Sequence, residues 1–210
     1  MNVSAPALPR PRMGAAALAV AGVLFLAYPL VRPYSDESSL AGAVAMASSA
    51  WIASHLFAVV GFVLLTLGLL ALHLVLNQRR TLHALVVTWI GAGLTLPYYG
   101  AEVFGANVIG HRAVQDGSAS LLRLVEEFRY LPAAITLFGA GLVLLAVGVT
   151  MAAVAIWRSG TLARWSAVPL AAGFALFLPQ FFAPPALRIA HGALIAIGGV
   201  RLGLELLRTR

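Results

Sequence analysis

Six long apolar segments constrain the fold of this chain more than any other feature of its sequence. Crossing a hydrocarbon core of ~30 Å as an α-helix takes ~20 predominantly apolar residues, and most of the six segments reach that length. The fifth is the weakest, because it is short and contains Pro169 and Pro179. The sequence therefore predicts an all-α integral membrane bundle of six transmembrane helices. The predicted spans are residues 14–31, 51–76, 83–103, 132–157, 166–182 and 186–206.

The composition agrees with a membrane protein and excludes several other classes. Only 10% of the residues are charged, whereas a soluble domain carries about 25%. All fourteen basic residues are arginine, and together with the excess of alanine and glycine this indicates a GC-rich genome. We therefore expect a multi-pass protein of a bacterial plasma membrane. The net charge of +7 is spread among the loops, so it predicts no nucleic-acid partner. The absence of cysteine excludes disulfides, thiolate metal sites and cysteine nucleophiles.

The distribution of arginine predicts the orientation in the membrane. If the N-terminus lies inside, the inner segments hold nine arginines and only one acid, Glu205. The outer segments then hold five arginines and six acids. The positive-inside rule therefore places both termini in the cytoplasm. The predicted organisation is a cytoplasmic tail over 1–13, a single transmembrane domain over 14–206 and a second cytoplasmic tail over 207–210.

The longest connection, residues 104–131, falls on the outer side in this topology. Within it, Leu121, Leu124, Val125 and Phe128 follow the i, i+3, i+4, i+7 spacing of one helical face. This pattern predicts a short amphipathic helix that lies at the outer interface or covers a cavity. A solvated extension of the fourth span is the alternative.

Polar side chains from several spans are predicted to share one depth. At 1.5 Å per residue, His55 lies roughly 30 Å above the inner end of its span, Glu102 about 27 Å and His191 about 24 Å. Gln180 closes the fifth span at the same level, and Arg188 is one turn above His191. Ionisable groups in a membrane span are expensive and commonly mark a functional site. We therefore expect a polar cavity that is open toward the outer leaflet.

The third span carries a polar stripe that ends in the carboxylate of Glu102. The stripe is spaced 3, 4, 3 and 4 residues apart, which places its members on one helical face. Pro97 interrupts the backbone hydrogen bonding within the stripe and predicts a kink. Hydrogen bonding and close packing between helices is the alternative explanation for its threonines and glycine. The stripe consists of Thr88, Gly91, Thr95, Tyr98 and Glu102.

The first functional hypothesis is an acid–base site for a hydrophobic or amphipathic small molecule, such as a lipid or an isoprenoid. A desolvated glutamate has a raised pKa, and a neighbouring histidine can hold or pass its proton. In this hypothesis Glu102, His55 and His191 are the catalytic residues. The residues that would contact the substrate are Tyr98, Tyr99, Gln180, Arg188 and Thr95.

Three alternatives use some of the same residues. His55 and His191 could be the axial ligands of a haem b in an electron-transfer subunit. The same histidines and Glu102 could bind a divalent metal, although no helical His-x-x-x-His or His-Glu-x-x-His motif supports it. In a purely structural alternative, Arg188 or Arg129 pairs with Glu102 and ties helices together.

Small residues in the fourth and sixth spans predict close contacts between helices. Such faces can pack within the chain, or they can dock a second copy or another membrane protein, which would make the chain an accessory subunit of a larger complex. The glycines concerned are Gly139, Gly141, Gly148, Gly192, Gly198, Gly199 and Gly203.

Overall fold

The computed structural model describes residues 10–208 and contains helices but no strands over that range. The predicted tails, 1–13 and 207–210, lie largely outside the described residues. The elements are α1 (Arg10–Val31), α2 (Leu40–Met46), α3 (Ser49–Leu76), α4 (Arg79–Gly100), the π-helical segment η1 (Ala101–Gly105), α5 (Ala106–Gln115), the 3-10 turn η2 (Ala119–Leu122), α6 (Arg123–Tyr130), α7 (Pro132–Ser159), α8 (Val168–Ala175), the 3-10 turn η3 (Pro179–Phe182) and α9 (Pro185–Arg208).

Within the described residues, five helices are long and apolar enough to cross a membrane, as expected of a multi-pass membrane protein. The predicted fifth span, 166–182, is not among them, because it is divided into α8, a turn and η3. Helix α8 ends at Ala175, four residues before Pro179. A helical Pro179 would lack the N–H that bonds to the Ala175 carbonyl, and its ring would clash with that carbonyl. Six continuous spans are therefore not confirmed.

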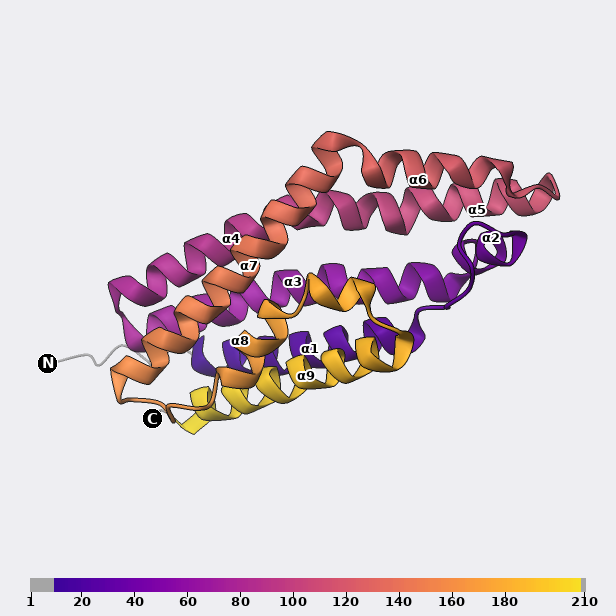
Figure 1. Cartoon of the computed structure of the whole chain (residues 1–210). Coiled ribbons are helices and arrows are strands. Elements are labelled where there is room, and N and C mark those ends of the chain that lie inside the picture. Colours follow the sequence, from indigo (N-terminus) through magenta and orange to yellow (C-terminus); the bar gives the residue numbers. More distant parts are fainter. Residues whose placement is uncertain (1–9, 209–210) are drawn as a thin grey trace, which may run out of the picture.

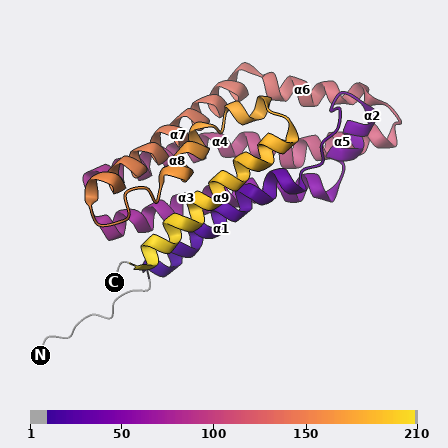
Figure 2. The same ribbon diagram turned by 60° about the horizontal axis from the view of Figure 1, so that its bottom comes forward.

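Six segments nevertheless form a closed ring in the order α1, α3, α4, α7, α8 and α9, each packed against its two neighbours. The described part of α1 begins, and that of α9 ends, on the same side of this bundle (Figures 1 and 2). We call this side the proximal end. Helices α7 and α9 both run toward it, so the broken segment between them carries the chain back to the opposite, distal end (Figure 1). The cytoplasmic location of the termini stays a prediction.

Glycines allow two pairs of helices to approach closely inside the chain. A Cβ added to Gly199 of α9 would lie 2.5 Å from the Leu18 carbonyl oxygen of α1. A Cβ added to Gly91 of α4 would lie 2.7 Å from the Leu145 backbone nitrogen of α7. Most of the glycines predicted for close contacts are thus used within the ring. Gly139 is an exception, because nothing lies within 4 Å of its added Cβ.

Aromatic rings from α1, α3, α4, α7 and α9 and from the turn after α8 pack together inside the bundle; we call this set the aromatic layer. Phe62 of α3 lies at its centre, with its ring centroid 4.9 Å from that of Phe25 and 5.4 Å from that of Tyr99. The ring of Phe177 lies 5.6 Å from Phe62 on another side. Such edge-on and tilted contacts stabilise the packing beyond the area that they bury. The layer consists of Phe25, Phe62, Tyr99, Phe138, Phe177 and His191.

The distal end carries a small cap built from α2, α5, η2 and α6 (Figure 1). The helix that begins at Arg79 continues through η1 into α5 and ends only at Gln115, so residues 104–115 of the predicted loop extend the third predicted span and not the fourth. Helix α6 follows, with Val125 buried and Leu124 46% exposed. Its predicted position at a membrane interface stays a prediction. The cap has its own apolar core of Ala43, Met46, Trp51, Ala106, Ala113, Leu122 and Val125.

The close contact between α1 and α9 can be tested with a single methyl group. We expect Gly199→Ala to lower the free energy of unfolding by about 1–3 kcal/mol, because its Cβ meets backbone that cannot rotate away. Gly139→Ala adds the same methyl group in open space and should leave stability unchanged or slightly raised. Thermal unfolding of both variants in one detergent would measure the difference, and equal melting temperatures would contradict the packing described.

Candidate functional site

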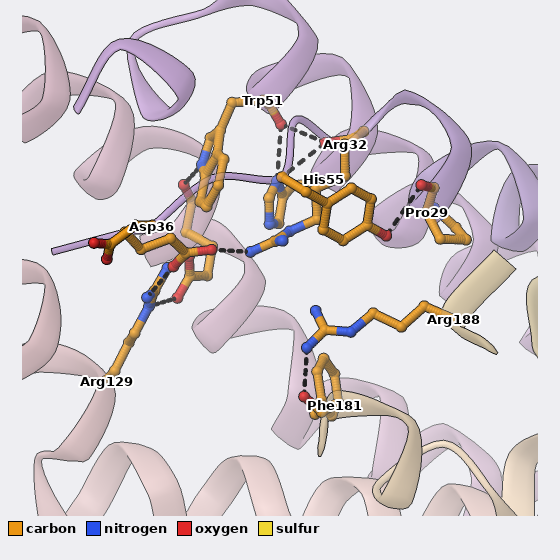
Figure 3. Close-up of polar contacts among 12 residues, drawn as sticks. Pro29, Arg32, Asp36, Trp51, His55, Arg129, Phe181 and Arg188 are labelled. Atoms are coloured by element: carbon orange, nitrogen blue, oxygen red, sulfur yellow. Dashed lines mark hydrogen bonds and ion pairs between the residues drawn. The ribbon is translucent and has the colours of Figure 1, made fainter. Parts of the chain in front are cut away.

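Four charged side chains form a continuous network at the distal end, which we call the distal charge network (Figure 3). Arg129 of α6 holds both carboxylate oxygens of Glu102 in η1, at 2.6 Å from Nε to Oε1 and 2.7 Å from Nη2 to Oε2. Its remaining Nη1 donates to Glu37 at 2.6 Å. Arg32, directly after α1, donates to the other oxygen of Glu37 at 2.5 Å. Two arginines and two glutamates therefore neutralise one another.

The network is mostly withdrawn from solvent. The side chain of Glu102 is 8% exposed and that of Arg129 19% exposed. An unpaired charge at such a depth would be strongly destabilising, whereas a two-pronged arginine–carboxylate pair satisfies both partners. Burial alone lowers the pKa of Arg129, but Glu102 and Glu37 outweigh it and raise the pKa above its ordinary value. Arg129 therefore remains charged.

Local structure fixes the position of Glu102. It lies in the π-helical turn that follows Pro97, where the helix widens before it continues as α5. The indole Nε1 of Trp51 donates to the Glu102 backbone carbonyl at 2.7 Å. Trp51 is itself held at the start of α3, where the Ser48 hydroxyl accepts a hydrogen bond from its backbone N–H. One tryptophan thus joins α3 to the turn that carries the carboxylate.

Aromatic rings extend the network toward α9. The guanidinium of Arg32 lies 4.8 Å from the Trp51 ring centroid and 5.3 Å from that of Tyr34. Arg188 of α9 lies 5.9 Å from the same Tyr34 ring. Its guanidinium donates to the backbone carbonyl of Phe181 (Figure 3). It also donates to the backbone carbonyl of Ala183, and it does not pair with Glu102. Of the two arginines predicted as structural partners of Glu102, the structure thus selects Arg129.

His55 lies beside the network, one helical turn after Trp51. Its Nδ1 donates to the Trp51 carbonyl at 2.8 Å, and because a carbonyl can only accept, Nδ1 carries the proton. Its ring is 5.3 Å from that of Tyr28 and 6.2 Å from that of Tyr99. The Tyr99 hydroxyl is buried and has no hydrogen-bond partner in the described structure. Trp51 contacts both Glu102 and His55, and Tyr99 lies beside His55, so these residues share one region.

His191 lies apart from that region. Its Nε2 donates to the Gly173 carbonyl at 2.7 Å, and its ring packs 5.4 Å from Phe177. The two histidines are linked only through a series of ring contacts, from His55 to Tyr99, then to Phe62, Phe177 and His191. The predicted convergence of His191 with Glu102 and His55 is therefore not seen.

The residues present do not fit a haem or a metal ion at this position. A haem between His55 and His191 would have to displace Phe62 and Phe177 from the aromatic layer. In the part of the chain that is described, no three histidine, aspartate or glutamate residues gather closely enough to bind a metal, so His55, Glu102 and His191 do not form such a group.

The predicted substrate contacts have other partners. The Thr95 hydroxyl donates to the Gly91 carbonyl of its own helix at 2.8 Å, and a Cβ added to Gly141 of α7 would collide with its oxygen. The Tyr98 ring stacks on Phe138 with centroids 4.1 Å apart. Gln180 is buried in η3. Their role in binding a substrate stays a prediction.

Arg32, Glu37 and the indole N–H of Trp51 were not predicted as site residues. A weak sequence signal existed for the first two, because they lie five residues apart in the short segment between the first two spans. Opposite charges so close to a membrane boundary suggest an ion pair. Arg129 was predicted only as a candidate partner of Glu102, and nothing in the sequence indicates that it also reaches Glu37, 92 residues earlier.

A cavity of about 260 Å³ adjoins the network on the side of α6; we call it the distal cavity. Two network members, Glu37 and Arg129, form part of its wall, and Leu122 and Val125 give it an apolar floor. Arg123 and Glu126 are exposed at its rim, and neither has an ion pair within residues 10–208. The full lining is Glu37, Ser38, Ala119, Leu122, Arg123, Val125, Glu126, Arg129 and Tyr130.

No protein-family model, curated protein or solved structure matches this chain. The chemistry of its own residues is therefore what bears on its function. The distal charge network and the distal cavity are the two polar features that bear on it most.

The energetic weight of the network can be measured by removing one charge. We expect Arg129→Gln to lower the free energy of unfolding by about 3 kcal/mol, because it leaves Glu102 buried without its partner. Arg112→Gln is the matched control, since its ion pair with Asp116 is exposed and contributes about 0–1 kcal/mol. Thermal or denaturant unfolding in detergent would measure both. A loss for Arg129→Gln no larger than that for Arg112→Gln would contradict the role of the pair.

The network also predicts a loss of stability in acid. Burial raises the pKa of Glu37, but Arg32 and Arg129 outweigh it and hold the pKa below its ordinary value of 4.5. Glu37 therefore stabilises the fold above that pH, and its contribution is lost as the pH falls through 4.5 toward the lower folded-state value. We expect the difference in melting temperature between wild type and Glu37→Gln to be large at pH 7 and to shrink on acidification. Glu127→Gln, which removes an exposed carboxylate from α6, should show a small difference at either pH.

Proposed function

We propose that this protein is a multi-pass protein of a bacterial plasma membrane that binds an amphipathic small molecule in the distal cavity. The ligand class is a zwitterionic lipid headgroup with a short apolar portion. One observation carries the proposal: the distal cavity combines an apolar floor with unpaired groups of both charges at its rim.

The rim groups match the two charges of a zwitterion. The guanidinium of Arg123 offers several donors in one plane, which suits a phosphate or a carboxylate. The carboxylate of Glu126, three residues later, suits an ammonium group. The volume of about 260 Å³ is near the lower end of small-molecule pockets, which run from about 300 to 1,000 Å³. A headgroup fits this volume, whereas a whole lipid does not.

The distal charge network supports this cavity from behind. Glu37 and Arg129 belong to both, and their ion pairs fix the wall before a ligand arrives. A wall that is ordered in advance reduces the entropy lost on binding. Because both oxygens of Glu102 are occupied by Arg129, the proposal is binding and not acid–base catalysis. A catalytic role for Glu102, His55 and His191 stays a prediction, and none of them lines the cavity.

The charge distribution supports an outward-facing distal cavity. The proximal segments hold most of the arginines and only one acid, Glu205. The positive-inside rule then places the proximal end in the cytoplasm. The distal cavity would accordingly open at the outer leaflet, where zwitterionic headgroups are within reach of α6.

Binding can be tested on the full chain in a neutral detergent. The probe is lysophosphatidylethanolamine, with lysophosphatidylglycerol and a long-chain primary amine as single-charge comparisons. We expect the zwitterion to bind most tightly. We also expect the double variant Arg123→Gln, Glu126→Gln to weaken its binding at least tenfold, because each charged hydrogen bond contributes about 1.5–3 kcal/mol. Arg112→Gln, which removes an exposed arginine of the same cap, should bind as wild type does.

Native mass spectrometry or calorimetry would give the affinities. Equal binding of the three probes, or unchanged binding to the double variant, would contradict the proposal. Because the rim residues are exposed, we expect the double variant to fold, and its melting temperature would verify this.

A further inference from the structure

An apolar groove between α7 and α8 lies at the other end of the bundle; we call it the α7–α8 groove. Its volume is about 560 Å³, and it faces outward, with Val154 and Val168 exposed on its two sides. The groove is hollow because both helices line it with small alanine side chains. The lining is Thr150, Ala153, Val154, Trp157 and Arg158 from α7 and Val168, Ala171, Ala172 and Ala175 from α8.

The proximal end of the groove is positively charged. Arg158 lines it, is exposed, and has no ion pair in the described part of the chain. Arg164 and Arg201 are also exposed near this end. Glu205 is the acid closest in the fold, and it already pairs with Arg208 and accepts a hydrogen bond from the Ala163 N–H. The unbalanced charge at the mouth of the groove is therefore positive.

Two tryptophans mark the level of the lipid headgroups at this point. Trp157 lines the groove, and its ring lies 4.3 Å from that of Trp165 in an edge-on arrangement. Both are exposed, at 39% and 59%. Tryptophan side chains concentrate at the boundary between hydrocarbon and headgroups. Arg158 thus stands where a phosphate would be, and the alanines stand where an acyl chain would be.

We infer that the α7–α8 groove binds one anionic phospholipid of the leaflet at the proximal end. The phosphate pairs with Arg158, and an acyl chain lies along the alanines between the two helices. From Arg158 to Thr150 the groove extends eight residues along α7, or about 12 Å. This length accommodates the upper part of an acyl chain. The inference is independent of the distal cavity, because the two sites share no residue.

A second groove of similar volume, about 550 Å³, lies between α1 and α3 and supplies a contrast. Its lining is entirely apolar and contains no arginine or tryptophan. Acyl chains can fill it without preference for any headgroup. The arginine and the tryptophan within its lining are therefore what distinguish the α7–α8 groove.

The test is a lipid titration of the delipidated full chain, followed by native mass spectrometry. The probes are phosphatidylglycerol and phosphatidylcholine with identical acyl chains. We expect the first phosphatidylglycerol to bind at least fivefold more tightly than the first phosphatidylcholine. Arg158→Gln should lower the affinity for phosphatidylglycerol about fivefold, the effect of one arginine near an anionic surface. Arg201→Gln, which removes a charge at the same end but outside the groove, should change it less than twofold.

A second pair of variants tests the apolar part of the site. Ala175→Trp fills the α7–α8 groove at an exposed position and should weaken binding of both lipids. Ala16→Trp fills the α1–α3 groove and should leave the preference for phosphatidylglycerol intact. Equal effects of Arg158→Gln and Arg201→Gln would overturn the inference, because they would indicate a diffuse surface charge. A dimer that Ala175→Trp abolishes would also overturn it, since a second copy would then occupy the groove.

Discussion

The distal half of this molecule depends on the ion pair between Glu102 and Arg129. Both oxygens of the carboxylate are occupied, and the third nitrogen of the guanidinium reaches Glu37, which in turn holds Arg32. These four residues come from the end of α1, the following loop, the π-helical turn and α6. A break in the pair would leave Glu102 buried without a partner and Arg129 with Glu37 alone, at a cost that exceeds the contribution of most single contacts. These ion pairs therefore fix the positions of the cap, the cavity wall and the start of α7 relative to one another.

An ionisable residue in a membrane span commonly indicates function, but its surroundings decide which function. Glu102 has the sequence context of a catalytic carboxylate, at the end of a polar stripe and near a histidine. Its neighbours satisfy it within the fold, because an arginine neutralises it and the Trp51 indole holds its backbone carbonyl. In the proposed function, the groups that bind a ligand are therefore the exposed charges of α6, and the ion pair supports the wall of their cavity.

Much of the helical architecture could be predicted from the sequence, because apolar runs of span length leave few alternatives in a membrane. The depth of Glu102 and His55 was also predictable, since it follows from the helical rise. The lateral position of His191 was not, because depth carries no information about which face of the bundle a residue occupies. His191 is hydrogen-bonded to Gly173 of α8 and packs against Phe177. Arg129 could be named only as one of two candidates, because its partner lies 27 residues away across an irregular turn.

The α7–α8 groove lies alongside the helical part of the predicted fifth span, from Val168 to Ala175. It exists because most of the residues with which α8 lines it are alanines. Pro179 follows the end of α8, which has only eight residues, and the rest of the segment is irregular. The chain still returns to the distal end, so the bundle closes, but one side of α7 keeps an apolar surface that protein does not cover. In a bilayer such a surface is filled by lipid, and the unpaired arginine at its mouth decides which lipid it is.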